Sequence, residues 1–137
     1  MRNRVVLALA GAVCLAAVPG ISAYARQKNA AHVRDIERVY QGRFSQMAFG
    51  DKPAFWLLDN DAASTALKYA EADPAEVAKE FKRLREDSIA LLRALPHEAW
   101  EKTGTHPEKG EITVEQLAVR LADHTDAHIG KIRALRA

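Results

Sequence analysis

The sequence has 137 residues, with 48% hydrophobic and 28% charged side chains, which fits one globular domain with a modest core and excludes a disordered chain. Arg2 and Arg4 supply the formal charge of +2, because the first 25 residues hold no acid and the remainder holds 18 basic and 18 acidic residues. This neutral remainder has no basic run among aromatic residues, which argues against a nucleic-acid partner. The only cysteine, Cys14, excludes an internal disulfide and a cysteine-based zinc site.

Residues 1–25 differ from the rest of the chain. A start with two arginines precedes an uncharged stretch, Pro19 and Gly20 break it, and residues 23–25 form an A-x-A site. This is the layout of a secretory signal peptide, and the uncharged stretch could also span a membrane if it is not cleaved. Alternatively, the segment is an atypical first helix of a cytoplasmic domain, or the start site is misassigned. Localisation depends on which of these holds.

Residues 28–48 have the apolar spacing of a helix, and His32 lies on the apolar side, four residues before Ile36. Residues 49–72 show no sustained period, so we expect a long connection with a short helix near residues 63–70.

A second helix is predicted from Asp73 to about Leu95. Asp73 can cap it, Pro74 suits its first position, and Pro96 ends it. Residues 96–112 form a connection that is rich in turn residues. Its two histidines, His97 and His106, are expected to be exposed.

The last helix is predicted to begin at a capping box over residues 113–116. Its inward face includes two histidines one turn apart among apolar residues: Leu117, Leu121, His124, His128, Ile132 and Leu135.

No run of residues has the pattern of a strand, so the predicted fold is all-α. Three long helices over residues 26–137, with residues 1–25 as an atypical or truncated first helix, would form a four-helix bundle. The connection at 49–72 is long enough to cross the bundle, so the second and third helices can run parallel. The second and fourth are then antiparallel, which would bring His32 near His124 and His128.

Two imidazoles four residues apart on one helix can bind one metal ion, and His32 is the candidate for a third ligand. Imidazole ligands suit zinc, nickel, copper or ferrous iron better than magnesium or calcium. Three ligands leave positions open for water or substrate, which is typical of reactive sites. The alternative is that these are core histidines whose ring nitrogens find hydrogen bonds within the protein.

Residues 31–137 resemble the DinB-like superfamily of helical metal-binding proteins. AAHVRDIERVYQGRF is similar to the family's second helix, GTHPEKGEITVEQL to its loop into the last helix, and LADHTDAHIGKIRAL to its last helix. The resemblance implies a bundle with a long crossover between helices 2 and 3, and it implies His32, His124 and His128 as metal ligands. Members include transferases that use a low-molecular-weight thiol, a mycothiol-dependent isomerase and proteins described as metal-dependent hydrolases.

The sequence departs from the family pattern near its start. A signal-like segment stands where the family has a full first helix, and RQKNAAH lacks the tryptophan that usually precedes the first ligand histidine. If residues 1–25 were removed, one apolar side of the bundle would need cover from a second copy in a homodimer or from a membrane.

Asp35 lies three residues after His32 on the same side of its helix. It could accept a ring N–H from a ligand histidine, act as a base, or form a salt bridge with Arg34, Arg38 or Arg43. The leading hypothesis is therefore a divalent-metal-dependent enzyme of the thiol-transferase or hydrolase type, with zinc as the first choice, nickel or iron as others, and a small-molecule substrate. The alternatives are a non-catalytic metal- or ligand-binding module and a degenerate family member.

Overall fold

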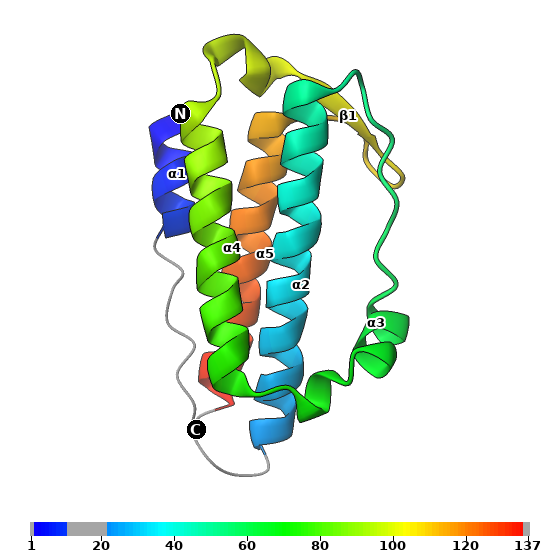
Figure 1. The fold of residues 1–137 in the computed structure, drawn as a ribbon, viewed down its shortest axis with the longest axis vertical. Coiled ribbons are helices and arrows are strands. Elements are labelled where there is room, and N and C mark those ends of the chain that lie inside the picture. The colour runs from blue at the N-terminus through cyan, green and yellow to red at the C-terminus, as the bar shows by residue number, and fades with distance from the viewer. Residues whose placement is uncertain (1, 11–21, 136–137) are drawn as a thin grey trace.

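The computed structural model describes residues 2–10 and 22–135, and within them four helices form a bundle: α1 (Arg2–Ala10), α2 (Ser22–Phe49), α4 (Pro74–Ala94) and α5 (Val114–Ala134). In Figure 1, α2 and α4 run upward and α1 and α5 run downward. Helix α2 packs against α4 and α5, and α1 packs against the same two helices. The predicted all-α bundle, with parallel α2 and α4 and antiparallel α2 and α5, is confirmed in this arrangement.

Helix α1 lies within the segment predicted to be signal-like. Its Val6 and Leu9 side chains are buried in the main core, so residues 2–10 form a short helix of the bundle in this structure. The Pro19-Gly20 break of the signal-peptide prediction lies outside the described residues, whereas the predicted A-x-A site at residues 23–25 lies in the first turn of α2. Among the helices that are described, none is both long enough and apolar enough to cross a bilayer.

Local sequence signals set the starts of α4 and α5. The Asp73 carboxylate accepts a hydrogen bond from the Ala75 amide at 2.8 Å, and Pro74 occupies the first turn of α4. The Thr113 hydroxyl accepts from the Gln116 amide at 3.2 Å, and the Gln116 side chain accepts from the Thr113 amide at 2.9 Å. Both predicted caps are therefore confirmed.

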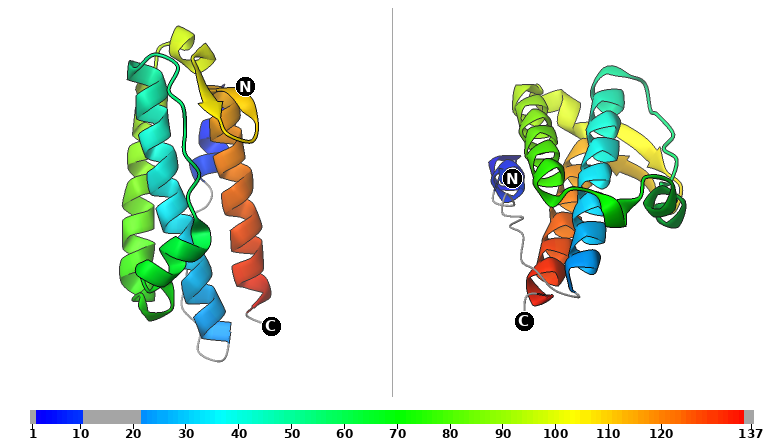
Figure 2. Two further views of the ribbon diagram at one scale, coloured as in Figure 1. Left: turned by 90° about the vertical axis from the view of Figure 1, so that its right-hand side faces the viewer. Right: turned by 60° about the horizontal axis from the view of Figure 1, so that its bottom comes forward.

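The crossover between α2 and α4 runs along the side of the bundle, as the left view of Figure 2 shows. It contains α3 (Asn60–Ala66) and the short 3₁₀ helix η1 (Tyr69–Glu71). The short helix predicted near residues 63–70 begins a few residues earlier, because the Asp59 side chain accepts hydrogen bonds from the Asp61 and Ala62 amides and caps α3 there.

The prediction that the chain has no strand was wrong. Strands β1 (Thr103–His106) and β2 (Gly110–Thr113) form an antiparallel hairpin, and the crossover pairs with it, since the Phe55 amide donates to the Thr105 carbonyl at 2.9 Å. Each strand has only four residues, and the third partner lies about fifty residues away in sequence. Neither feature gives a pattern that a sequence window can detect.

The connection after α4 also differs from expectation. His106, predicted to be exposed, is only 5% exposed, because the hairpin folds back onto the bundle. Its Nδ1 accepts a hydrogen bond from the Glu108 amide at 3.2 Å. His97, in the 3₁₀ helix η2 (His97–Glu101), is exposed as predicted.

Candidate metal centre

Three histidines meet where the start of α2 lies beside the end of α5. His32 comes from α2, and His124 and His128 come from successive turns of α5. The ring centroid of His32 lies 5.2 Å from that of His124 and 4.7 Å from that of His128, and the two α5 rings are 4.5 Å apart. The structure thus brings together the three residues that the sequence singled out.

The spacing of the ring nitrogens fits one metal ion. One ligand nitrogen from each histidine lies within 4.8 Å of the others, and the Nε2 atoms of His32 and His124 are 3.2 Å apart. Two nitrogens bound to a zinc-like ion at about 2.0–2.1 Å would be separated by roughly 2.9–3.4 Å for bond angles between a right angle and the tetrahedral angle. The rings therefore need only small movements to share an ion.

The environment of the three rings favours their neutral, metal-binding form. Burial, with smaller contributions from the neighbouring His128 and His32, lowers the pKa of His124 to about 4. Burial and the neighbouring His32 also lower the pKa of His128 to about 4, and burial lowers that of His32. At neutral pH each ring therefore has a lone pair to offer without first losing a proton.

A cavity of about 460 Å³ opens beside the histidines. The crossover forms one wall of this cavity with residues of α3 and η1, and α2 and α5 form the others. Every residue of the lining has a polar group: Lys28, Asn29, His32, Asn60, Asp61, Ser64, Tyr69, His124 and His128. The cavity is of a size for a small polar molecule that could reach the histidines.

Asn29 was not recognised from the sequence, although it lies on the His32 side of α2, one turn earlier. Its Oδ1 atom lies 2.9 Å from Nδ1 of His128, and its Nδ2 atom donates to the Ala25 carbonyl at 2.7 Å. By contrast, Nδ1 of His124 is buried and makes no hydrogen bond within the described part of the chain. The spacing to His32 was the signal available for Asn29, but its partner on α5 is 99 residues away.

Asp35 is a buried residue of α2, one turn after His32, and its carboxylate is bound by arginines. Its Oδ1 accepts hydrogen bonds from Arg34 Nε at 2.9 Å and from Arg38 Nη1 at 2.6 Å. Burial opposes ionisation of this carboxyl, but the hydrogen bonds from Arg34, the nearby Tyr69 hydroxyl and the neighbouring arginine charges bring its pKa below the usual value. No hydrogen bond joins it to a described histidine, and its charge acts on His32 by partly offsetting the effect of burial on that pKa.

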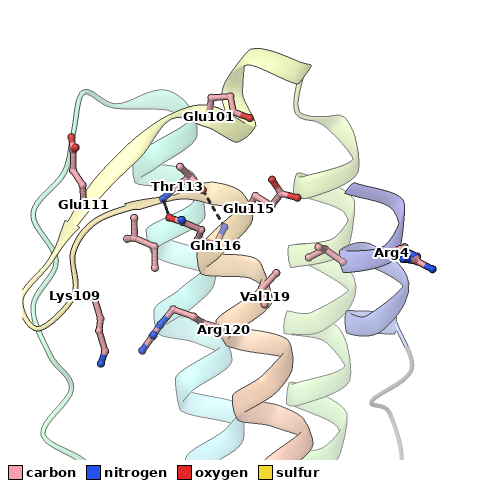
Figure 3. Close-up of a pocket in the computed structure, with 11 residues that line it drawn as sticks. Arg4, Glu101, Lys109, Glu111, Thr113, Glu115, Gln116, Val119 and Arg120 are labelled. Carbon is pink, nitrogen blue, oxygen red and sulfur yellow. Dashed lines mark hydrogen bonds between the residues drawn. The ribbon is translucent and has the colours of Figure 1, made fainter. Parts of the chain in front are cut away.

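A larger cavity, of about 730 Å³, lies at the other end of α5 between α1 and the hairpin (Figure 3). Its lining mixes charges of both signs, including Arg4, Glu115 and Arg120. Within the described residues, the group of three side chains that could hold a metal ion lies at the smaller cavity and not at this one. The chemistry that the sequence predicts is therefore at the histidine end of the bundle.

Comparisons with known proteins agree with this fold. The sequence matches the family model of the DinB superfamily over residues 27–132. Among solved structures, YfiT from Bacillus subtilis, described as "a probable metal-dependent hydrolase with an unusual four-helix bundle topology", superposes with a TM-score of 0.71 and 24% sequence identity. The alignment covers 96% of this chain and 81% of YfiT. A search of curated proteins finds no match.

Proposed function

The chain belongs to the DinB superfamily, and we propose that its three-histidine group binds a divalent metal ion at the active site of an enzyme of the hydrolase or thiol-transferase type. The observation that carries the proposal is the convergence of His32, His124 and His128 within coordination reach of one ion. Zinc is the first choice of metal, with nickel or iron as alternatives, because the donors are all imidazole nitrogens.

Three protein ligands and an adjoining cavity are the arrangement of a reactive site. A bound ion of this kind lowers the pKa of a water or thiol beside it and polarises a carbonyl oxygen. The three histidines would hold the ion between α2 and α5, and the cavity of about 460 Å³ on the crossover side would admit the substrate. A purely structural zinc site would instead be closed by a fourth protein ligand.

The cavity lining supports a polar small-molecule substrate. The Lys28 ammonium and the Asn60 and Ser64 side chains surround the space beside the histidines, where they can donate hydrogen bonds to oxygen atoms of a ligand. Asp35 is proposed to act through its charge on His32, because Arg34 and Arg38 already donate to its Oδ1 and Arg34 also donates to its Oδ2.

Metal analysis of the purified protein tests the ligand set. Protein loaded with zinc and then desalted should retain stoichiometric metal, and His124→Ala should lose it. His97→Ala is the matched control, since His97 is exposed on η2 at the other end of the bundle. Failure of the wild type to retain zinc, nickel or iron, or equal retention by His124→Ala, would refute the metal site.

Activity assays test the reaction class. The metal-loaded protein should either hydrolyse members of a panel of small polar esters and amides or conjugate an electrophile with one of several low-molecular-weight thiols. The activity should fall with chelation and in His124→Ala. Full metal loading without turnover of either kind would contradict the enzyme and favour a binding module.

A further inference from the structure

We infer that Asn29 is a positioning residue that fixes the tautomer of His128, so that Nε2 of this ring carries the lone pair that a metal ion needs. The hydrogen bond between the Asn29 side chain and the His128 ring is the observation behind this inference. The expected effect on metal affinity rests on the proposed function, but the tautomer of His128 can be measured without any metal.

The orientation of the Asn29 amide follows from its second partner. The Nδ2 atom lies 2.7 Å from the Ala25 carbonyl oxygen, one turn earlier on α2. A carbonyl oxygen can only accept a hydrogen bond, so the nitrogen end of the amide must face it. This contact removes the usual ambiguity between the two ends of an asparagine amide. The oxygen end, Oδ1, therefore faces His128.

The tautomer of His128 follows from that orientation. Oδ1 of Asn29 can only accept, and it lies 2.9 Å from Nδ1 of His128, so Nδ1 must carry the proton. A neutral imidazole has one N–H, which leaves Nε2 unprotonated. Because Nδ1 is engaged by Asn29, Nε2 is the one nitrogen of this ring that can bind a cation. A ring that is held through its other nitrogen is the usual arrangement of a metal-ligating histidine.

The other two histidines are not prepared in the same way. Their Nε2 atoms lie 3.2 Å apart, so in the metal-free protein one of them must donate its Nε2 proton to the other. That ring has to move its proton to Nδ1 before it can bind a metal through Nε2. For His124 the transfer of the proton from Nε2 to Nδ1 is unfavourable, because Nδ1 is buried and no group within the described residues accepts a hydrogen bond from it. His128 is therefore the ring whose free Nε2 is fixed by a neighbouring side chain, whereas only the accepting ring of the His32–His124 pair has a free Nε2.

Imidazole ¹H–¹⁵N NMR spectra of the metal-free protein at neutral pH test the tautomer directly. We expect the wild type to show His128 with a proton on Nδ1 and an unprotonated Nε2. Asn29→Ala should shift His128 toward a mixture with the Nε2–H form. Asn29→Asp should keep the proton on Nδ1, because a carboxylate oxygen accepts the same hydrogen bond. Asn60→Ala is the control, since Asn60 lines the same cavity without a hydrogen bond to a ring.

Zinc affinity, measured by competition with a chelator, tests the consequence. Asn29→Ala should bind zinc about 10-fold or more weakly than the wild type, whereas Asn29→Asp and Asn60→Ala should not be weakened to this extent.

An Nε2–H tautomer in the wild type, or an unchanged tautomer in folded Asn29→Ala, would overturn the inference. If Asn29→Ala does not fold, loss of the Nδ1–H form in folded Asn29→Asp would overturn it instead. If the tautomers behave as expected but the wild type binds no metal, the proposed function fails while the role of Asn29 stands.

Discussion

Arg85 on α4 and Glu37 on α2 form an ion pair inside the bundle, with Nη2 and Oε2 2.7 Å apart and both side chains 0% exposed. Arg85 also donates to the Leu9 carbonyl of α1 at 2.8 Å and to the Thr125 hydroxyl of α5 at 2.9 Å. One guanidinium from α4 thus contacts the other three helices of the bundle. Thr125 follows His124 directly, so the Arg85 guanidinium links the helix that carries His124 and His128 to the rest of the core.

Removing one partner of this pair should destabilise the protein strongly. Glu37→Leu leaves the Arg85 charge buried without its counter-ion, which costs about 3–5 kcal/mol. The double variant with Arg85→Met should recover a large part of that loss, because no unpaired charge remains. The free energy of unfolding in urea measures both effects. Lys82→Met, which breaks an exposed pair with Glu86, is the control and should cost less than about 1 kcal/mol.

The histidine cluster should make the metal-free protein sensitive to acid. The pKa values of His124 and His128 are about 4 in the folded protein and near the ordinary 6.5 in the unfolded chain. Between these pH values the unfolded chain binds more protons, so the free energy of unfolding falls as the pH falls from about 6.5 to about 4. Urea unfolding in the presence of a chelator measures this slope. A double His124→Gln/His128→Gln variant should have a shallower slope, and an equal slope would contradict the assignment.

Two glycines should respond to alanine in opposite ways. At Gly104 an added Cβ would lie 2.5 Å from Cζ of the Phe55 ring and 3.1 Å from the Pro53 carbonyl oxygen. Gly104→Ala should therefore force the crossover away from the hairpin and cost about 1–3 kcal/mol. At Gly42 an added Cβ meets nothing within 4 Å, and the position is inside α2. Gly42→Ala should stabilise the protein by about 0.5–1 kcal/mol, and thermal unfolding compares the two variants.

The features that the sequence predicted well depend on neighbouring residues. The α4 start needs only Asp73 and Pro74, and the α5 start needs only Thr113 and Gln116. The convergence of the histidines needed one further step, the length of the crossover, which sets the relative direction of α2 and α5. Each of these signals lies within one segment of sequence or follows from one loop length.

The features that the sequence did not predict depend on contacts between distant segments. The crossover forms a hydrogen bond to the hairpin through the Phe55 amide and the Thr105 carbonyl. His106, the next residue of the hairpin, is buried. Asn29 bonds to a ring on another helix. Arg85 and Glu37 look like surface residues of amphipathic helices until the helices are placed together, because charged side chains are rarely fully buried. Such pairings require the three-dimensional arrangement.

Helix α1 supplies the fourth side of the bundle. Leu9 is 0% exposed and belongs to the main core, while its carbonyl accepts the hydrogen bond from Arg85. Leu9→Ala should leave a cavity against α4 and α5 and cost about 2–5 kcal/mol. Arg2→Ala, at an exposed position of the same helix, should change the free energy of unfolding by less than about 0.5 kcal/mol. Urea unfolding of both variants, with the intact N-terminus verified by mass spectrometry, measures the difference. Equal stabilities of Leu9→Ala and the wild type would show that the bundle does not depend on this helix.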